Sequence, residues 1–424
     1  MISLEDARSV ILDACEELGV ETRSVGEALG HLLAEPVRAN EDIPAFANSA
    51  MDGYALRSVD TSPAPARLKV IDTVLAGDGR EVEVGPGEAV RIMTGAPLPL
   101  HSDAVCMVEL TTTDVSGTWV TVGVEVERGT SVRHPGEDIR SGTEVFGPRT
   151  QITPAHVGVL SSLGIESVRV QRRPVVGVIS TGDELAVGPG PLRRGQLRDG
   201  NRPMLLSLLA RSHFEAVDLG VAPDDVSTLS QKVRDACSHC DALVTSGGVS
   251  VGDADVVRMA LAEMCGEGLR WMQVAIRPAK PLAFGRVDGT PILGLPGNPV
   301  SSAVSFELFA RPALNKMAGS RHPVRPSIEA RAVVAMRREV DGRLHLVRVV
   351  AEVDAAGALW VRPSGGQHSH QLRAMADANA LALLPDGQGV EAQQAVQVLV
   401  LDPDRVVCNA ELGLPRRPNP EAAG

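Results

Sequence analysis

Three loops rich in glycine and hydroxyl residues are the first feature of this sequence that could do chemistry. Each follows a short apolar run, and the loops span residues 180–182, 245–248 and 296–299. Glycine lets backbone N–H groups approach a ligand closely, and a helix that starts after such a loop favours a negative charge. Because the carboxyl ends of parallel strands meet at one edge of a sheet, we predict that the three loops converge on a phosphate or another oxyanion. The expected contacts are Ser180, Thr181, Gly182, Ser246, Gly247 and Gly248.

Carboxylates and cations also lie in polar loops of the chain. Acids near a phosphate commonly hold Mg²⁺ or orient water, whereas Arg and Lys attract the anion itself. The combination predicts phosphoanhydride chemistry on an anionic ligand, assisted by a hard cation. Each acid could instead be a helix cap or a solvated side chain. The candidates are Asp52, Asp138, Glu184, Asp224 (also a good helix cap) and Asp255, with the cations Arg277 and Lys280.

Lysine is scarce in this chain, which makes Lys280 informative. The sequence has four lysines among 41 basic residues, and Lys280 is the one beside a candidate loop. A compact ammonium fits where a planar guanidinium does not, although chance retention explains the residue equally well.

Two other spacings allow metal binding, but we favour simpler interpretations. Cys237 and Cys240 have metal or redox spacing without a second pair, so we expect reduced, mostly buried thiols. His368 and His370 could share a metal, although a polar turn is the preferred interpretation. No zinc constellation and no GxSxG elbow for acyl transfer is present.

Composition excludes several classes of protein. The formal charge is −12 and aromatic residues make up 2% of 424 residues, which argues against a nucleic-acid-binding surface. No stretch approaches 18 consecutive apolar residues, and the N-terminus lacks the pattern of a signal peptide. We therefore expect a soluble cytoplasmic protein with no membrane or nucleic-acid partner.

The periodicity of the apolar residues predicts a multidomain α/β and β fold. Helices are expected over residues 3–18, 27–34, 154–164, 201–211, 224–238 and 300–317, and short β runs over 67–133 and 326–402. We predict a discontinuous N-terminal domain (1–45 plus 133–173) interrupted by an all-β insertion (46–132). A central α/β domain with a parallel-type sheet (174–322), a small C-terminal β-barrel (323–403) and a flexible tail (404–424) follow.

Eight segments together resemble one known family. They are SAMDGYA (49–55), RIMTGAPLP (91–99), RHPGEDI (133–139), STGDEL (180–185), GQLRDGNRPML (195–205), TSGGVSVGDAD (245–255), RPAKPLAFG (277–285) and GLPGNPVSS (294–302). They are similar, in the same order, to the signature segments of molybdopterin molybdenumtransferase, the bacterial MoeA family, which is related to the E domain of gephyrin.

The resemblance implies the last step of molybdenum cofactor assembly. Molybdate would be inserted into adenylylated molybdopterin, and the pyrophosphate bond would be cleaved to release AMP, with Mg²⁺ as cofactor. The resemblance also implies four domains, a three-layer MogA-like α/β domain and a homodimer. Expected partners are molybdopterin adenylyltransferase and either molybdoenzyme apoproteins or their chaperones.

The resemblance also assigns roles to individual residues. The functional set of the family falls on Asp52, Thr94, Asp138, Glu184, Asp224, Asp255, Pro296 and Pro299, with Asp224 and Asp255 near the metal. The oxyanion pocket of the family is matched by Arg277, Lys280, Ser301, Arg348 and Ser369. This chain departs from the family at Ala279, where glycine is usual, and at Gln273, where some members have lysine.

Two other functions stay open at this level. The α/β domain alone also resembles molybdopterin adenylyltransferase, the enzyme of the preceding step. A scaffold role, as the gephyrin relative has besides catalysis, is the other, although the chain has no long interaction linker or repeat.

Overall fold

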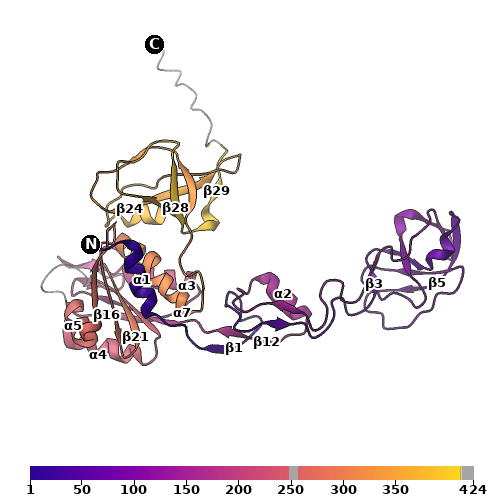
Figure 1. Cartoon of the computed structure of the whole chain (residues 1–424), viewed down its shortest axis with the longest axis horizontal. Coiled ribbons are helices and arrows are strands. Elements are labelled where there is room, and N and C mark those ends of the chain that lie inside the picture. Colours follow the sequence, from indigo (N-terminus) through magenta and orange to yellow (C-terminus); the bar gives the residue numbers. More distant parts are fainter. Residues whose placement is uncertain (248–255, 411, 413–424) are drawn as a thin grey trace, which may run out of the picture. The chain divides into compact units, whose positions relative to one another are not determined.

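The structure is a computed structural model, and it describes residues 1–247, 256–410 and 412. Two compact units are present, one formed by Met1–Val20 with Gln171–Gly424 and the other by Glu21–Val170 (Figure 1). Among the described residues, no helix is both long enough and apolar enough to cross a membrane.

The first unit contains a six-stranded mixed sheet. Its order is β16 (Glu215–Ala222), β13 (Val175–Thr181), β17 (Ala242–Ser246), β21 (Thr290–Leu295), β20 (Pro281–Val287) and β18 (Arg270–Gln273). The first four strands are parallel, as predicted, and β20 and β18 continue the sheet in antiparallel pairing. Strands that follow β13 in sequence lie on both of its sides. This reversal of strand order is where open α/β sheets bind ligands.

Helices cover both faces of this sheet, so the domain has three layers (Figure 1). On one face, α4 (Val226–Cys237) and α5 (Val256–Cys265) pack Leu229 and Leu261 against Leu243. On the other face, Leu205 of α3 (Asn201–Arg211) packs with Val244, the next residue of β17. Because successive side chains of a strand point to opposite faces, the apolar run of β17 supplies both cores.

The first helix corrects the predicted N-terminal domain. Residues 1–45 were expected to form one domain with residues 133–173, but helix α1 (Leu4–Ala14) packs in the core of the first unit. Its buried face, Leu4, Ala7 and Ile11, shares a cluster with Phe309 and Leu314. The amphipathic pattern showed which face is buried, but it held no information about which core receives that face.

The predicted helix over 300–317 is interrupted. It consists of α6 (Pro299–Ser305), a π-helical turn (Phe306–Ala310) and α7 (Arg311–Met317). Pro312 has no N–H and cannot bond the carbonyl of Leu308 in the α-helical pattern. The Arg8 Nε of α1 instead donates to that carbonyl at 3.3 Å.

The C-terminal domain of this unit is a closed β-barrel, as predicted. Its ring is β24 (Leu344–Val353), β25 (Leu359–Pro363), β22 (Ile328–Ala332), β28 (Ala395–Val400) and β26 (Ala380–Leu384), and it closes by pairing of β26 with β24. Strand β19 (Ile276–Arg277), from the RPAKP segment, pairs with the start of β24. Short apolar side chains such as Ala332, Ala351 and Val361 fill the interior.

The flexible tail was predicted to start at residue 404, which is too early. Residues 407–408 form β29 (Val407–Cys408), which pairs in parallel with Glu352 and Val353 of β24. Arg405 donates to the carbonyls of Ala376, Asp377 and Ala378. The polar, Pro-rich composition of the tail hid this short pairing segment.

The second unit contains a separate six-stranded sheet. Its order is β7 (Ala104–Met107), β4 (Gly53–Leu56), β6 (Glu88–Ile92), β5 (Ala66–Val74), β9 (Trp119–Val122) and β8 (Thr111–Thr113). Strand β4 is buried throughout, and Gly53 is required there because a Cβ would overlap the carbonyl of Cys106.

The rest of this unit is built from short pairings and one helix. Strands β1 (Val20–Ser24) and β12 (Ser167–Gln171) pair, as do β2 (Val37–Arg38) with β11 (Glu144–Phe146) and β3 (Asn48–Ser49) with β10 (Val132–Arg133). Helix α2 (Pro154–Ser162) agrees with the prediction over 154–164. The helix predicted over 27–34 is wrong, because this segment forms turns and bridges that bury Ala28 and Leu33 against Leu160 of α2.

Candidate functional site

The three glycine and hydroxyl loops lie side by side at one edge of the α/β sheet. Ser180 at the end of β13 pairs in register with Ser246 at the end of β17. Ser246 pairs in turn with Leu295, which directly precedes Pro296. The predicted convergence is therefore confirmed for these strand ends, and two of them present a buried serine at the point where the strand order reverses.

Glycine is needed where two of these loops meet. Gly247 has φ +98°, and a Cβ there would lie 2.9 Å from the backbone oxygen of Thr181. Gly297 lies close to it, since a Cβ on Gly297 would be 3.6 Å from the Gly247 Cα. Gly182 has φ +141°, and a Cβ on it would overlap the carboxylate of Glu184, which folds back over the loop. The loops thus pack with their backbones in contact.

A polar network that the sequence interpretation did not assign connects these loops. Asn201, at the start of α3, donates from Nδ2 to the Ser246 Oγ at 2.9 Å and to the Gly297 carbonyl at 2.7 Å. The Ser180 Oγ donates to Asp199 at 3.1 Å, and the buried Arg202 donates from Nε to the same carboxylate at 2.8 Å. Asp199, Asn201 and Arg202 all fall in the segment GQLRDGNRPML, so the motif was noted while its side chains were given no role.

Two carboxylates lie at the ends of neighbouring strands β13 and β16. The Asp183 N–H donates to Asp224 Oδ2 at 3.3 Å, and the Asp224 N–H donates to Asp183 Oδ1 at 3.1 Å. Asp224 was the candidate cap of α4, but Asp225 takes that role by accepting from the Thr228 N–H at 2.7 Å. The structure thus removes the capping interpretation of Asp224 and adds Asp183 as its neighbour.

Two predicted residues fall in a part of the chain that the structure does not describe. Gly248 and Asp255 both lie outside the described residues. Their predicted roles in ligand and metal binding stay predictions.

The third loop leads into helix α6 and brings the barrel domain to the site. Pro296 is buried, and Pro299 occupies the first turn of α6, where a missing N–H is tolerated. The Val300 N–H donates to the carbonyl of Ser369 at 3.1 Å. Val300 directly precedes the buried Ser301, so this bond brings Ser369 near Ser301. The first turn of α6 and loop 364–371 therefore belong to one region.

Arg348 is fully buried, with an exposed fraction of 0%, and only part of its guanidinium is hydrogen-bonded. Its Nη2 donates to the carbonyls of Gly366 at 2.7 Å and His368 at 3.3 Å. Nε and Nη1 are buried and have no hydrogen-bond partner in the structure. Burial lowers the pKa of this guanidinium, because the charged form is poorly solvated. Buried donors of this kind fit an anion-binding region beside Ser369.

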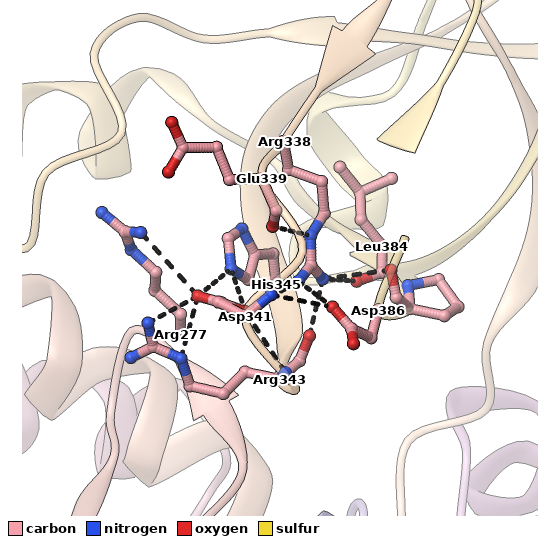
Figure 2. Close-up of polar contacts among 9 residues, drawn as sticks. Arg277, Arg338, Glu339, Asp341, Arg343, His345, Leu384 and Asp386 are labelled. Carbon is pink, nitrogen blue, oxygen red and sulfur yellow. Dashed lines mark hydrogen bonds and ion pairs between the residues drawn. The ribbon is translucent and has the colours of Figure 1, made fainter. Parts of the chain in front are cut away.

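Arg277 lies in a group of charged residues rather than in the glycine loops (Figure 2). Its Nη1 is 4.0 Å from Asp341, which also contacts Arg338, Arg343 and His345. Arg277 lines a pocket of about 520 Å³ with Arg337, Arg338, His345 and His368. Hydrogen bonds from His345 and Arg343 outweigh desolvation and hold the pKa of Asp341 well below its usual range.

Lys280 follows Arg277 at the other end of the RPAKP turn. Its backbone carbonyl accepts from the Val274 N–H at 2.8 Å, and its side chain is half-buried. Ala279 has φ +74° and an exposed fraction of 3%. An alanine in this left-handed conformation is strained, and glycine, the residue that the resemblance predicts at this position, would adopt it without strain.

The remaining predicted residues, Asp52, Thr94 and Asp138, lie in the second unit. Asp52 Oδ1 accepts from both the N–H and the hydroxyl of Thr94, at 2.7 Å each. These bonds, the backbone one first, lower the pKa of Asp52. Asp138 is exposed on the loop after β10. The structure joins Asp52 to Thr94, and their predicted relation to the first unit stays a prediction.

Cys237 with Cys240 and His368 with His370 are the two pairs that have metal-ligand spacing. Within residues 1–247 and 256–410, no group of three His, Cys, Asp or Glu side chains is arranged to hold a metal. All six cysteines are free thiols. His368 and His370 stack on each other, with ring centroids 5.6 Å apart.

Comparison with known proteins agrees with this arrangement over most of the chain. The chain matches the MoeA N-terminal region (domain I and II) over residues 2–164 and a probable molybdopterin binding domain over 177–316. It also matches the MoeA C-terminal region (domain IV) over 332–401. A Haemophilus influenzae protein named molybdopterin molybdenumtransferase is 37% identical over 94% of this chain and 98% of its own length. The chain belongs to the molybdopterin molybdenumtransferase family.

Other relatives support the same assignment. The protein of that name from Bacillus subtilis is 35% identical over 88% of each chain. A crystal structure titled as the molybdopterin biosynthesis moeA protein of Pyrococcus horikoshii OT3 is 28% identical and covers 94% of this chain and 100% of its own, with a TM-score of 0.78. The α/β domain with a separate β-barrel is thus the fold of this family, and the chain is a transferase of molybdenum cofactor biosynthesis.

Proposed function

We propose that this chain inserts molybdate into adenylylated molybdopterin and cleaves the pyrophosphate bond, so that AMP is released. The observation that best supports the proposal is the registered edge formed by Ser180, Ser246 and Leu295, with the Asp183 and Asp224 pair beside it. Glycine loops at the point where the strand order reverses suit the phosphates, and the carboxylates suit a metal or water beside the scissile bond.

The oxyanion would bind at the other side of this region. Ser301 and Ser369 are brought together by the bond from Val300 to Ser369. Buried Arg348 donates to the carbonyl of His368, the neighbour of Ser369, and keeps two donors without a partner. In this proposal Lys280 and Arg277 attract molybdate, a divalent anion, by charge. Glu184 and Asp255 complete the set of acids near the phosphates.

The carboxylates of Asp183 and Asp224 are oxygen ligands of the kind that Mg²⁺ prefers. Mg²⁺ keeps several waters and commonly uses one or two carboxylates together with substrate phosphates, and Asp183 and Asp224 could supply these carboxylates. When bound, Mg²⁺ would neutralise charge on the phosphates.

The proposal includes an assembly and partners. A cytoplasmic homodimer would let Asp52, Thr94 and Asp138 of one subunit complete the site of the other. The six free thiols suit a reducing compartment. Molybdopterin adenylyltransferase would supply the substrate, and molybdoenzyme apoproteins or their chaperones would receive the product.

The deciding experiment is AMP release from adenylylated molybdopterin by the purified chain, with and without molybdate and Mg²⁺. We expect release that depends on both, and loss of release in Asp224→Asn with unchanged folding. Asp225→Asn is the matched control, since the neighbouring acid caps α4 through one oxygen that asparagine retains, and turnover should stay unchanged. Binding without release would favour a scaffold role, and adenylylation from ATP would favour the preceding enzyme.

A further inference from the structure

Asp341 lies at the centre of a group of cations that reaches from the barrel domain to the RPAKP turn (Figure 2). Its Oδ1 accepts from Arg338 Nη2 at 2.7 Å, and its Oδ2 accepts from Arg343 Nε at 2.9 Å. His345 Nε2 lies 3.0 Å from the same Oδ2. Arg277 Nη1 approaches Asp341 at 4.0 Å.

The Asp341 carboxylate is held firmly in place. Arg338, whose side chain is 2% exposed, also donates to Asp386 at 2.7 Å and to backbone carbonyls that include Leu384. The Asp341 N–H donates to the same Asp386 carboxylate at 3.1 Å. Backbone and side chain of Asp341 are thus both anchored, so it offers a fixed negative charge.

Arg277 is the loosely held member of this group. Its backbone is fixed, because β19 pairs with β24 and places Arg277 opposite His345. Its side chain is 56% exposed and contacts Asp341 at 4.0 Å, which is longer than a hydrogen bond. Such a contact orients a guanidinium toward the 520 Å³ pocket without locking it there.

We propose that Asp341 is a positioning residue that orients Arg277 toward the incoming oxyanion. The inference deepens the proposed function and rests on it, since Arg277 is taken there to attract molybdate. Without the carboxylate, the Arg277 guanidinium would face Arg343 and Arg338, and repulsion between like charges would turn it away from the pocket. Asp341 itself touches no substrate in this scheme.

The negative charge of Asp341 could also act directly on the bound anion, and this effect would change the affinity in the opposite direction. Removing a negative charge near an anion site would tighten binding of the anion. Arg338 and Arg343 contact Asp341 closely and compensate most of its charge, so we expect loss of orientation to prevail. The sign of the change in affinity therefore separates the two roles.

The test is calorimetric binding of molybdate to the full-length chain and its variants. Asp341→Asn should weaken binding by about two- to five-fold, within the range of an exposed ion pair, and Asp341→Glu should restore much of it. In the Arg277→Ala background, Asp341→Asn should have no further effect. Asp386→Asn is the matched control, because it also removes a carboxylate charge from Arg338 and does not contact Arg277, while its amide oxygen can still accept from the Asp341 N–H. A urea unfolding midpoint for each variant checks that folding is retained.

Kinetics give a second measure. In AMP release, Asp341→Asn should raise the KM for molybdate and leave kcat unchanged. Unchanged or tighter binding in Asp341→Asn, or equal weakening with and without Arg277, would overturn the inference while leaving the proposed function intact. Absence of molybdate binding by the wild-type chain would instead contradict the proposed function, and the inference with it.

Discussion

Arg8 and Leu308 are joined by a hydrogen bond across 300 residues of sequence. The Arg8 Nε donates to the Leu308 carbonyl at 3.3 Å, at the turn of the helix where Pro312 cannot donate. Burial lowers the pKa of Arg8, whereas Glu5 partly opposes this. The helix that begins at the third site loop is thus fastened to α1 by a half-buried cation.

We therefore expect Arg8→Met to lower the free energy of unfolding by about 1.5–3 kcal/mol, the usual contribution of a hydrogen bond with a charged partner. Methionine keeps most of the aliphatic stem, so the loss reports on the guanidinium. Urea unfolding at pH 7.5 measures it. Arg373→Met is the control, since the Arg373 side chain is 95% exposed and pairs with Asp377 at 3.9 Å. An equal loss in both variants would show that the bond to Leu308 contributes nothing specific.

Local patterns predicted the strand ends well because the relevant physics is local. A buried strand followed by glycine and hydroxyl residues shows where each strand ends, and parallel pairing then brings Ser180 and Ser246 to one edge. The sequence could not show whether Asp224 or Asp225 caps α4. Both are aspartates, and only the backbone conformation of the folded chain decides which of them is the N-cap.

Contacts between segments that are distant in the sequence could not be predicted from local sequence patterns. Nothing in the residues around Asp341 indicates that β19 pairs with β24 and brings Arg277 beside it. The docking of α1 is similar, since its apolar face fits any core of suitable shape. The π-helical turn before Pro312 was also missed, although a proline inside a helical pattern is a signal for such an interruption.

Ala279 provides a prediction about strain. Replacing it with glycine relieves about 1–2 kcal/mol of left-handed strain, but it removes a buried methyl worth about 0.8 kcal/mol and adds unfolded-state entropy worth about 0.4–1 kcal/mol. These contributions nearly cancel, so Ala279→Gly should change the free energy of unfolding by less than about 1 kcal/mol.

Ala260, fully buried in α5, is the matched control for that substitution. With no strain to relieve, Ala260→Gly should cost about 2 kcal/mol from lost helix propensity and lost burial. Denaturant titration of both variants gives the comparison. Equal losses at the two positions would mean that Ala279 is not strained.

The stability of the barrel domain should depend on pH through His345. Burial lowers the pKa of His345 from 6.5, and its hydrogen bond to Asp341 opposes this only in part. The unfolded chain then binds more protons than the folded one below about pH 6.5, so stability falls as pH decreases from 6.5 toward the lowered pKa.

Replacing His345 with Gln should remove this component of the pH dependence. Urea midpoints at pH 7.5 and pH 5.5 for wild type and His345→Gln measure the difference. We expect the wild type to lose more stability between the two values than the variant does. Identical losses would contradict the lowered pKa, since other acids titrate equally in both proteins.

The thiols should react in an order set by burial and pKa. Cys408 is exposed on β29, whereas Cys15 and Cys240 are buried, and desolvation raises the pKa of each of these two to about 11. At pH 8 a thiol with that pKa is only about 0.1% thiolate, the reactive form. A thiol-exchange reagent should therefore show one fast group, from Cys408, and Cys15 and Cys240 should react only on unfolding. Cys237 and Cys265 are partly exposed, and desolvation raises the pKa of both, so they should react more slowly than Cys408. Cys408→Ser should abolish the fast phase, and a fast phase that survives this substitution would contradict the predicted order.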